Sequence, residues 1–263
     1  MIERKPSWIA SDRLPSIRLP CKAAMGAIMA LVVIVHISVP VKSEDKNMNL
    51  EDKWSMEMKQ GKEALTADDW VSAEKHFREA FGLAQENFPI DDIRRGKSLY
   101  FLGHMRLITG GASYGDDGRF QEAAEILEKS SEPESKKLLV DALLGQGEMA
   151  SRLGKNDESI PVLERALTLA QTEYGANNAK CADILYSLGL CYGLRQHFDK
   201  SVQVLKQAID LFEHSKRYKE LSSALADLAS VLDSAGRSEE SQEAQSRADE
   251  VARQHGVGFS WSY

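Results

Sequence analysis

The chain has 263 residues, of which 43% are hydrophobic and 28% are charged, so it can bury a sizeable core and is not disordered by composition. Its formal net charge is -7, although its first 43 residues hold six Lys and Arg against two acids. The acidic remainder argues against nucleic acid as a partner, because proteins neutralise phosphates with a basic face. Helix-favouring residues dominate after the N-terminus, so we expect an all-α fold without a sheet.

Residues 1–43 have the features of a targeting segment. Basic residues precede an uncharged stretch from Ala23 to Val35, and the helix breaker Pro40 follows it. A secretory signal would be cleaved after Ser43, whereas a retained segment, Ala23 to Val41, is long enough to anchor the chain in a membrane. Both alternatives predict an exported body, periplasmic, extracellular or anchored outside the cytoplasm, and a membrane contact only through this segment if it is not cleaved. Residues 44–53 are a predicted linker.

From Trp54 onwards the chain repeats a helix-turn-helix unit, most completely from Cys181 to Phe212. Apolar residues recur at helical spacing on both sides of a short polar connection, which predicts two antiparallel helices. Each unit also pairs a small residue late in its first helix with one in its second: Gly61 and Ala80, Gly103 and Ser130, Gly147 and Ala166, Gly189 and Ala208, Ala229 and Ala248. We expect these residues where two helices cross closely, with eight extra residues, Gly110 to Asp117, in the second unit.

This pattern resembles the tetratricopeptide repeat over about residues 54–254. The resemblance rests on the motif residues Leu188-Gly189 with Tyr192 and Phe198, Leu102-Gly103 with Phe120, and Gly61 with Trp70, Ala73 and Phe77. The long interval between units is similar to that of kinesin light chains. The resemblance implies an α-solenoid of about five antiparallel helix pairs, a tetratricopeptide superhelix whose first helices line a concave face that binds a peptide or partner protein.

The end of the chain departs from the pattern. Ser238 to Arg253 keeps only a narrow apolar stripe, with Ser238, Ser241 and Gln245 where aromatic or apolar residues are expected, so we interpret it as a cap. Residues 255–263 form an aromatic tail. This tail either folds back or stays mobile, or it binds a partner.

Residues that could carry catalysis or hold a metal do not form a recognisable set. Gly111 to Gly115 matches the letters of a nucleophile elbow, but such an elbow needs a preceding strand. Asp116-Asp117 lacks calcium-loop spacing, and the histidines lack zinc spacing. Cys181 and Cys191 lie too far apart on one predicted helix to form a disulfide. We therefore predict no enzyme activity, no cofactor and no metal.

The candidate partner-binding residues lie on the first helices of the second, third and fourth units. In the fourth unit, an apolar stripe of Tyr186, Leu190 and Leu194 faces away from Leu185 and Leu188. Either the following arm or the tail covers this stripe, or it belongs to a groove. The predicted groove consists of Tyr100, His104, Leu144, Glu148, Tyr186, Leu190 and Leu194. The sequence thus predicts a non-catalytic interaction module for an unidentified protein or peptide; the alternative is an oligomeric scaffold, such as a homo-oligomer, or an accessory subunit of a membrane complex.

Overall fold

The computed structural model describes residues 48–110 and 118–257, and within them the chain forms ten α-helices and no strand. The helices are α1 (Leu50–Thr66), α2 (Trp70–Asn87), α3 (Ile93–Ile108), α4 (Arg119–Lys129), α5 (Pro133–Arg152), α6 (Asn156–Tyr174), α7 (Ala179–Leu194), α8 (Phe198–His214), α9 (Tyr218–Ser234) and α10 (Ser238–His255). The predicted all-α fold is confirmed for this part of the chain. The predicted targeting segment, the Gly111–Gly115 match and most of the aromatic tail lie outside it.

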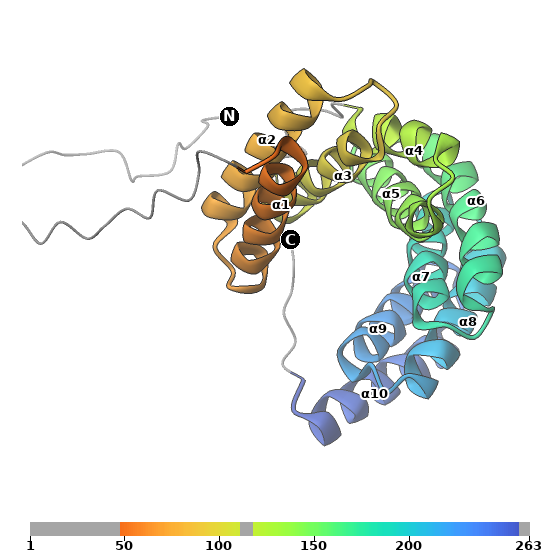
Figure 1. Ribbon diagram of the computed structural model, residues 1–263. Helices are drawn as coiled ribbons and strands as arrows, with labels where there is room; N and C mark the ends of the chain where they lie inside the picture. Colours follow the sequence, from red (N-terminus) through yellow and green to blue (C-terminus); the bar gives the residue numbers. More distant parts are fainter. Residues whose placement is uncertain (1–47, 111–117, 258–263) are drawn as a thin grey trace, which may run out of the picture. The chain divides into compact units, whose positions relative to one another are not determined.

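The helices pack as consecutive pairs in two layers. Each helix contacts the next one along the chain, and the odd-numbered helices α3, α5, α7 and α9 also contact one another. Figure 1 shows α1 and the other odd-numbered helices along one side of the stack, with the even-numbered helices on the other side. We call this side the odd-helix side. Among the described helices, none is both long enough and apolar enough to span a membrane.

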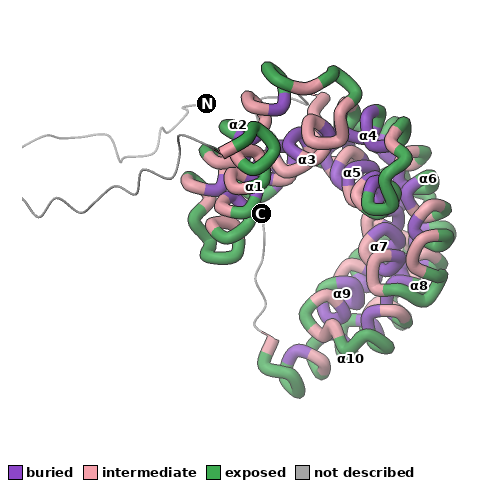
Figure 2. The backbone as a smooth tube through the Cα atoms, in the orientation of Figure 1, coloured by how far each residue is buried: buried purple, intermediate pink, exposed green. Residues whose placement is uncertain are grey.

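The first helix begins earlier than predicted. α1 starts at Leu50, inside the predicted linker of residues 44–53, because Asn49 caps it by accepting a hydrogen bond from the Asp52 backbone N–H. At the other end, α10 buries only Ala244, Ala248 and Ala252, so its outer face is polar, as a terminal cap requires. Figure 2 shows that buried residues lie where the helices meet.

One turn recurs between the helices. In the loops after α1, α5, α7, α8 and α9 the middle residue has a left-handed backbone, at Asp68, Gly154, Gln196, Lys216 and Gly236. The N–H of the next residue donates to the carbonyl five residues earlier, for example from His197 to Tyr192 at 2.9 Å. This bond closes a Schellman motif, which satisfies a carbonyl that the helix end would otherwise leave free.

Glycines set the distance between the two helices of a pair. A Cβ added to Gly61 would lie 2.5 Å from the Phe77 ring, and one added to Gly189 would lie 2.6 Å from Leu205. Leu163 occupies the same place against Gly147. The close crossing was predicted, but a large side chain of the second helix fills the space above each glycine, while Ala80, Ala166 and Ala208 are buried further along the second helices.

In the second pair, the residue that packs against the first-helix glycine differs from the one predicted. Gly103 faces Phe120, 17 residues later, where the other pairs have a separation of 16. Ser130, the expected small partner, is instead the C-cap of α4. α4 begins only at Arg119 and has 11 residues, and the packing register of this pair is one residue longer than that of the others, rather than eight.

A serine hydroxyl ties each of the last three pairs together, buried at Ser159 and Ser201 and partly buried at Ser241. Ser159 donates to the Gly147 carbonyl at 2.7 Å and Ser201 donates to the Gly189 carbonyl at 2.7 Å. Ser241 donates to the Ala229 carbonyl at 2.8 Å in the same way. The sequence interpretation treated Ser241 as a departure from the repeat, and this was wrong: its hydroxyl makes the bond that Ser159 and Ser201 make.

Candidate partner-binding groove

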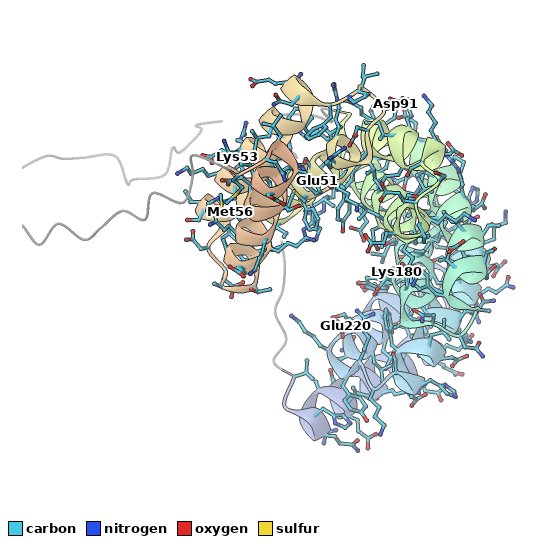
Figure 3. The ribbon with its side chains drawn as sticks, viewed as in Figure 1. Glu51, Lys53, Met56, Asp91, Lys180 and Glu220 are labelled. Carbon is cyan, nitrogen blue, oxygen red and sulfur yellow. The ribbon has the colours of Figure 1, made fainter. Side chains whose placement is uncertain are left out.

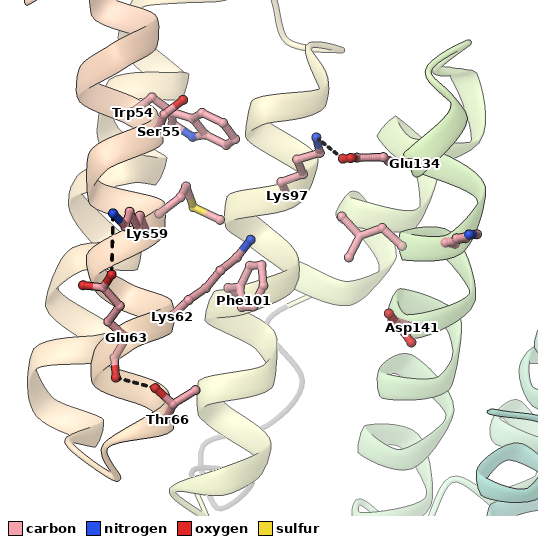
Figure 4. Close-up of a pocket in the computed structure, with 13 residues that line it drawn as sticks. Trp54, Ser55, Lys59, Lys62, Glu63, Thr66, Lys97, Phe101, Glu134 and Asp141 are labelled. Atoms are coloured by element: carbon pink, nitrogen blue, oxygen red, sulfur yellow. Dashed lines mark hydrogen bonds and ion pairs between the residues drawn. The ribbon is translucent and has the colours of Figure 1, made fainter. Parts of the chain in front are cut away.

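A groove of about 660 Å³ lies on the odd-helix side between α1, α3 and α5. Its volume falls within the range of roughly 300–1,000 Å³ that is usual for ligand sites. Figure 4 shows the side chains that line it. They are Trp54, Ser55, Met58, Lys59, Lys62, Glu63, Thr66, Lys97, Phe101, Glu134, Lys137, Leu138 and Asp141.

The apolar part of the groove is held in place by contacts between α1, α2 and α3. The Trp54 indole N–H donates to Ser98 Oγ at 3.0 Å, which joins α1 to α3. Phe101 stacks on Phe77, with 4.8 Å between the ring centroids. Since Phe77 is itself seated against Gly61, the absence of a side chain at Gly61 allows this aromatic stack to form. Contacts among three helices therefore hold the apolar surface of the groove in place.

At the charged rim of the groove, every acid is paired with a lysine, but two lysines are not paired with an acid of the described residues. Each of its three acids has a lysine nearby: Glu63 lies 3.8 Å from Lys59, Glu134 lies 3.2 Å from Lys97, and Asp141 lies 2.9 Å from Lys180. The other two lysines are placed over aromatic rings, Lys62 at 5.1 Å from the Phe101 centroid and Lys137 at 5.8 Å from that of Tyr174. In the described chain, no carboxylate lies within 4.0 Å of either ammonium group.

None of the seven predicted groove residues lines this groove. Tyr100 and His104 lie on α3, and their rings stack with centroids 6.0 Å apart. Burial lowers the pKa of His104, which favours the neutral imidazole, and its buried Nδ1 has no hydrogen-bond partner in the part of the chain that the structure describes. Burial also raises the pKa of Tyr100, and the negative charges of Asp141 and Glu148 raise it further.

Leu144 and Glu148 lie on the next odd helix, α5. Leu144 packs against the core at partial exposure. Glu148 accepts a hydrogen bond from Ser187 Oγ of α7 at 3.1 Å, yet burial outweighs this bond and raises the pKa of the carboxyl group. Neighbouring odd helices are also linked by Lys180 and Asp141, and by Arg217 and Asp183 at 2.8 Å. Figure 3 marks Lys180 on α7 and Glu220 on α9.

The stripe on α7 is partly covered by the following pair. The Tyr186 hydroxyl donates to Asp227 of α9, and its ring meets Phe212 edge to face at 6.2 Å. Leu190 is half-buried, whereas Leu194 is 64% exposed. Contact of these residues with a partner therefore stays a prediction. Lys62 and Phe101 line the groove between α1, α3 and α5. In the sequence, only their positions on the first helices of their pairs indicated that they could line a groove.

One possible ligand set was missed. Glu57, His76 and Glu79 each offer one ligand atom, and these atoms lie within 4.8 Å of one another. His76 Nδ1 is 2.7 Å from Glu57 Oε2, and Glu79 lies 3.9 Å from Lys75. A hydrogen bond and an ion pair therefore account for the arrangement. His76 and Glu79 are three residues apart on α2, but Glu57 comes from α1, so the spacing of the sequence did not indicate the complete set.

Two family models match parts of the chain. Residues 138–214 match the model described as Tetratricopeptide repeat, and residues 186–257 match the one described as Anaphase-promoting complex subunit 5. Each match covers less than half of the chain. No curated protein matches the sequence.

Solved structures share the fold at low sequence identity. BtubC (BKLC) from P. vanneervenii is 17% identical, with a TM-score of 0.58 over 82% of this chain and 96% of its own. A putative kinesin light chain with nearly identical TPR-like repeats from Podosopora anserina is 12% identical, with a TM-score of 0.64 over 80% of this chain and 99% of its own. A Rap protein complexed with competence and sporulation factor is 16% identical, with a TM-score of 0.60 over 79% of this chain and 56% of its own.

Proposed function

Because this chain is a tetratricopeptide repeat protein with repeats similar to those of kinesin light chains, we propose that it is a non-catalytic module that binds a segment of a partner protein in the groove between α1, α3 and α5. The observation that carries the proposal is the groove itself, which combines an apolar surface with a charged rim on the odd-helix side. Such a surface suits an extended peptide, whose apolar side chains and backbone need both kinds of contact.

Two further observations favour binding over catalysis at this place. Among the described residues that line the groove there is neither His nor Cys, and the buried His104 lies outside it. A Rap protein that shares this fold over 56% of its own length has been solved in complex with competence and sporulation factor, which is a precedent for binding.

The test uses peptide display against the full chain and two variants. Ser55 is exposed and lines the groove, so Ser55→Trp should fill it and remove the selected binders. Ser223→Trp makes the same change at an exposed position of α9 and should retain them. Selected peptides that bind the wild type and Ser55→Trp equally would refute this site.

We also propose that the body is exported, on the basis of the basic and then apolar residues 1–43. An epitope placed after Tyr263 should be found outside the cytoplasm. Recovery of the full-length chain from the soluble cytosol would refute export. N-terminal sequencing would distinguish cleavage after Ser43 from a retained anchor.

A further inference from the structure

The rim of the groove has an excess of unpaired positive charge in a chain whose net charge is -7. Its three acids are each within 4.0 Å of a lysine, whereas Lys62 and Lys137 have no carboxylate within that distance among the described residues. The groove therefore differs in charge from the protein as a whole.

The ring of Phe101 positions the ammonium group of Lys62. Its ammonium lies 5.1 Å from the Phe101 centroid, and Figure 4 shows the side chain extending beside that ring between the helices. A contact of this kind contributes about 0.5–1 kcal/mol at an exposed site and leaves the N–H donors of the ammonium available. Lys137 is held over Tyr174 in a similar way.

Resting on the proposed function, we infer that the bound segment is an acidic peptide, with Asp or Glu carboxylates that pair with Lys62 and Lys137 and an apolar side chain on the surface of Trp54, Met58 and Phe101. The apolar surface accounts for the choice of a peptide over a purely polar anion. Carboxylates account for the two free ammonium groups, which would attract such a partner and disfavour a basic one.

The probes are three fluorescent pools of short peptides that share one fixed Leu and differ in the flanking residues: Asp and Glu, Ser and Gln, or Lys and Arg. Anisotropy titrations with the full chain should show the acidic pool binding about tenfold more tightly than the neutral pool, since two exposed ion pairs each contribute up to about 1 kcal/mol. The advantage should shrink as salt is raised.

The double variant Lys62→Glu, Lys137→Glu should lose the preference for the acidic pool. Lys129→Glu with Lys219→Glu changes the net charge equally at exposed positions of α4 and α9, and should preserve it. Circular dichroism should confirm that both double variants fold.

The outcomes separate the two proposals. Equal binding of acidic and neutral pools, lost in Ser55→Trp, would overturn the acidic partner while leaving the groove as a binding site. Binding of no pool by the wild type would overturn both proposals. Tighter binding of a labelled oligothymidylate than of the acidic pool would replace the peptide with a nucleic acid.

Discussion

Adding even one methyl group to the glycine at the centre of the fourth pair should destabilise the fold. Gly189 lies on α7, and a Cβ there would approach both Cγ and Cδ2 of Leu205 to 2.6 Å. Leu205 is fully buried, so it has no solvent-exposed space to move into. Gly82 on α2 is the matched control, because a Cβ there meets nothing within 4 Å.

The two substitutions should have opposite signs. Replacing a helical Gly by Ala stabilises by about 0.5–1 kcal/mol in both cases, because the unfolded chain loses freedom. At Gly189, overpacking costs about 1–3 kcal/mol and outweighs this gain. Gly189→Ala should therefore lower the free energy of unfolding by about 1–2 kcal/mol, and Gly82→Ala should raise it by about 0.5–1 kcal/mol.

Urea unfolding followed by far-UV circular dichroism measures both changes. A loss of 1 kcal/mol corresponds to about 2–4 °C in melting temperature for a chain of this size. A Gly189→Ala variant that is as stable as Gly82→Ala would refute the assigned close crossing of α7 and α8.

Three further predictions test other contacts. Ser201→Ala should cost about 1 kcal/mol in urea unfolding, because Ser201 donates to the Gly189 carbonyl at 2.7 Å, whereas Ser223→Ala at an exposed site should cost nothing measurable; equal effects would contradict the role of the bond. Burial raises the pKa of Glu148, so its contribution to stability is present below the ordinary value of 4.5 and is lost as pH rises through the raised value. Glu148→Gln should therefore raise the melting temperature above neutral pH and change it little in acid, and a uniform shift would contradict this explanation. Zn²⁺ and EDTA should leave the melting temperature unchanged, since His76 already contacts Glu57; a zinc-dependent rise that His76→Ala abolishes would overturn the predicted absence of metal.

Helix content and pairing could be predicted because they depend on local signals. Apolar spacing from Cys181 to Phe212 and a short connection at Gln196 are enough to indicate two helices and a reversal. The second pair was placed incorrectly because Gly103 and Ser130 are both small, and size alone does not show that Phe120 fills the space above Gly103.

The groove could not be predicted because it depends on three helices from three successive pairs. Periodicity shows that Tyr186 lies on a second apolar stripe, but it cannot show that Asp227, one pair later, accepts its hydroxyl hydrogen bond. Likewise, Lys62 and Lys137 look like any solvated lysines in the sequence. The rim carboxylates Glu63, Glu134 and Asp141 lie within four residues of one of these lysines in the sequence. Only the structure shows that they pair with other lysines, which leaves Lys62 and Lys137 without a carboxylate partner among the described residues.

The recurring turn makes the C-terminal half suitable for elongation. The chain leaves α7, α8 and α9 through the same left-handed residue and the same backbone hydrogen bond, at Gln196, Lys216 and Gly236. A second copy of residues 179–217 placed after Arg217 would enter and leave through turns that the protein already makes. The number of units is therefore open to change by duplication, and arrays of several lengths could be produced from this one chain without designing a new loop.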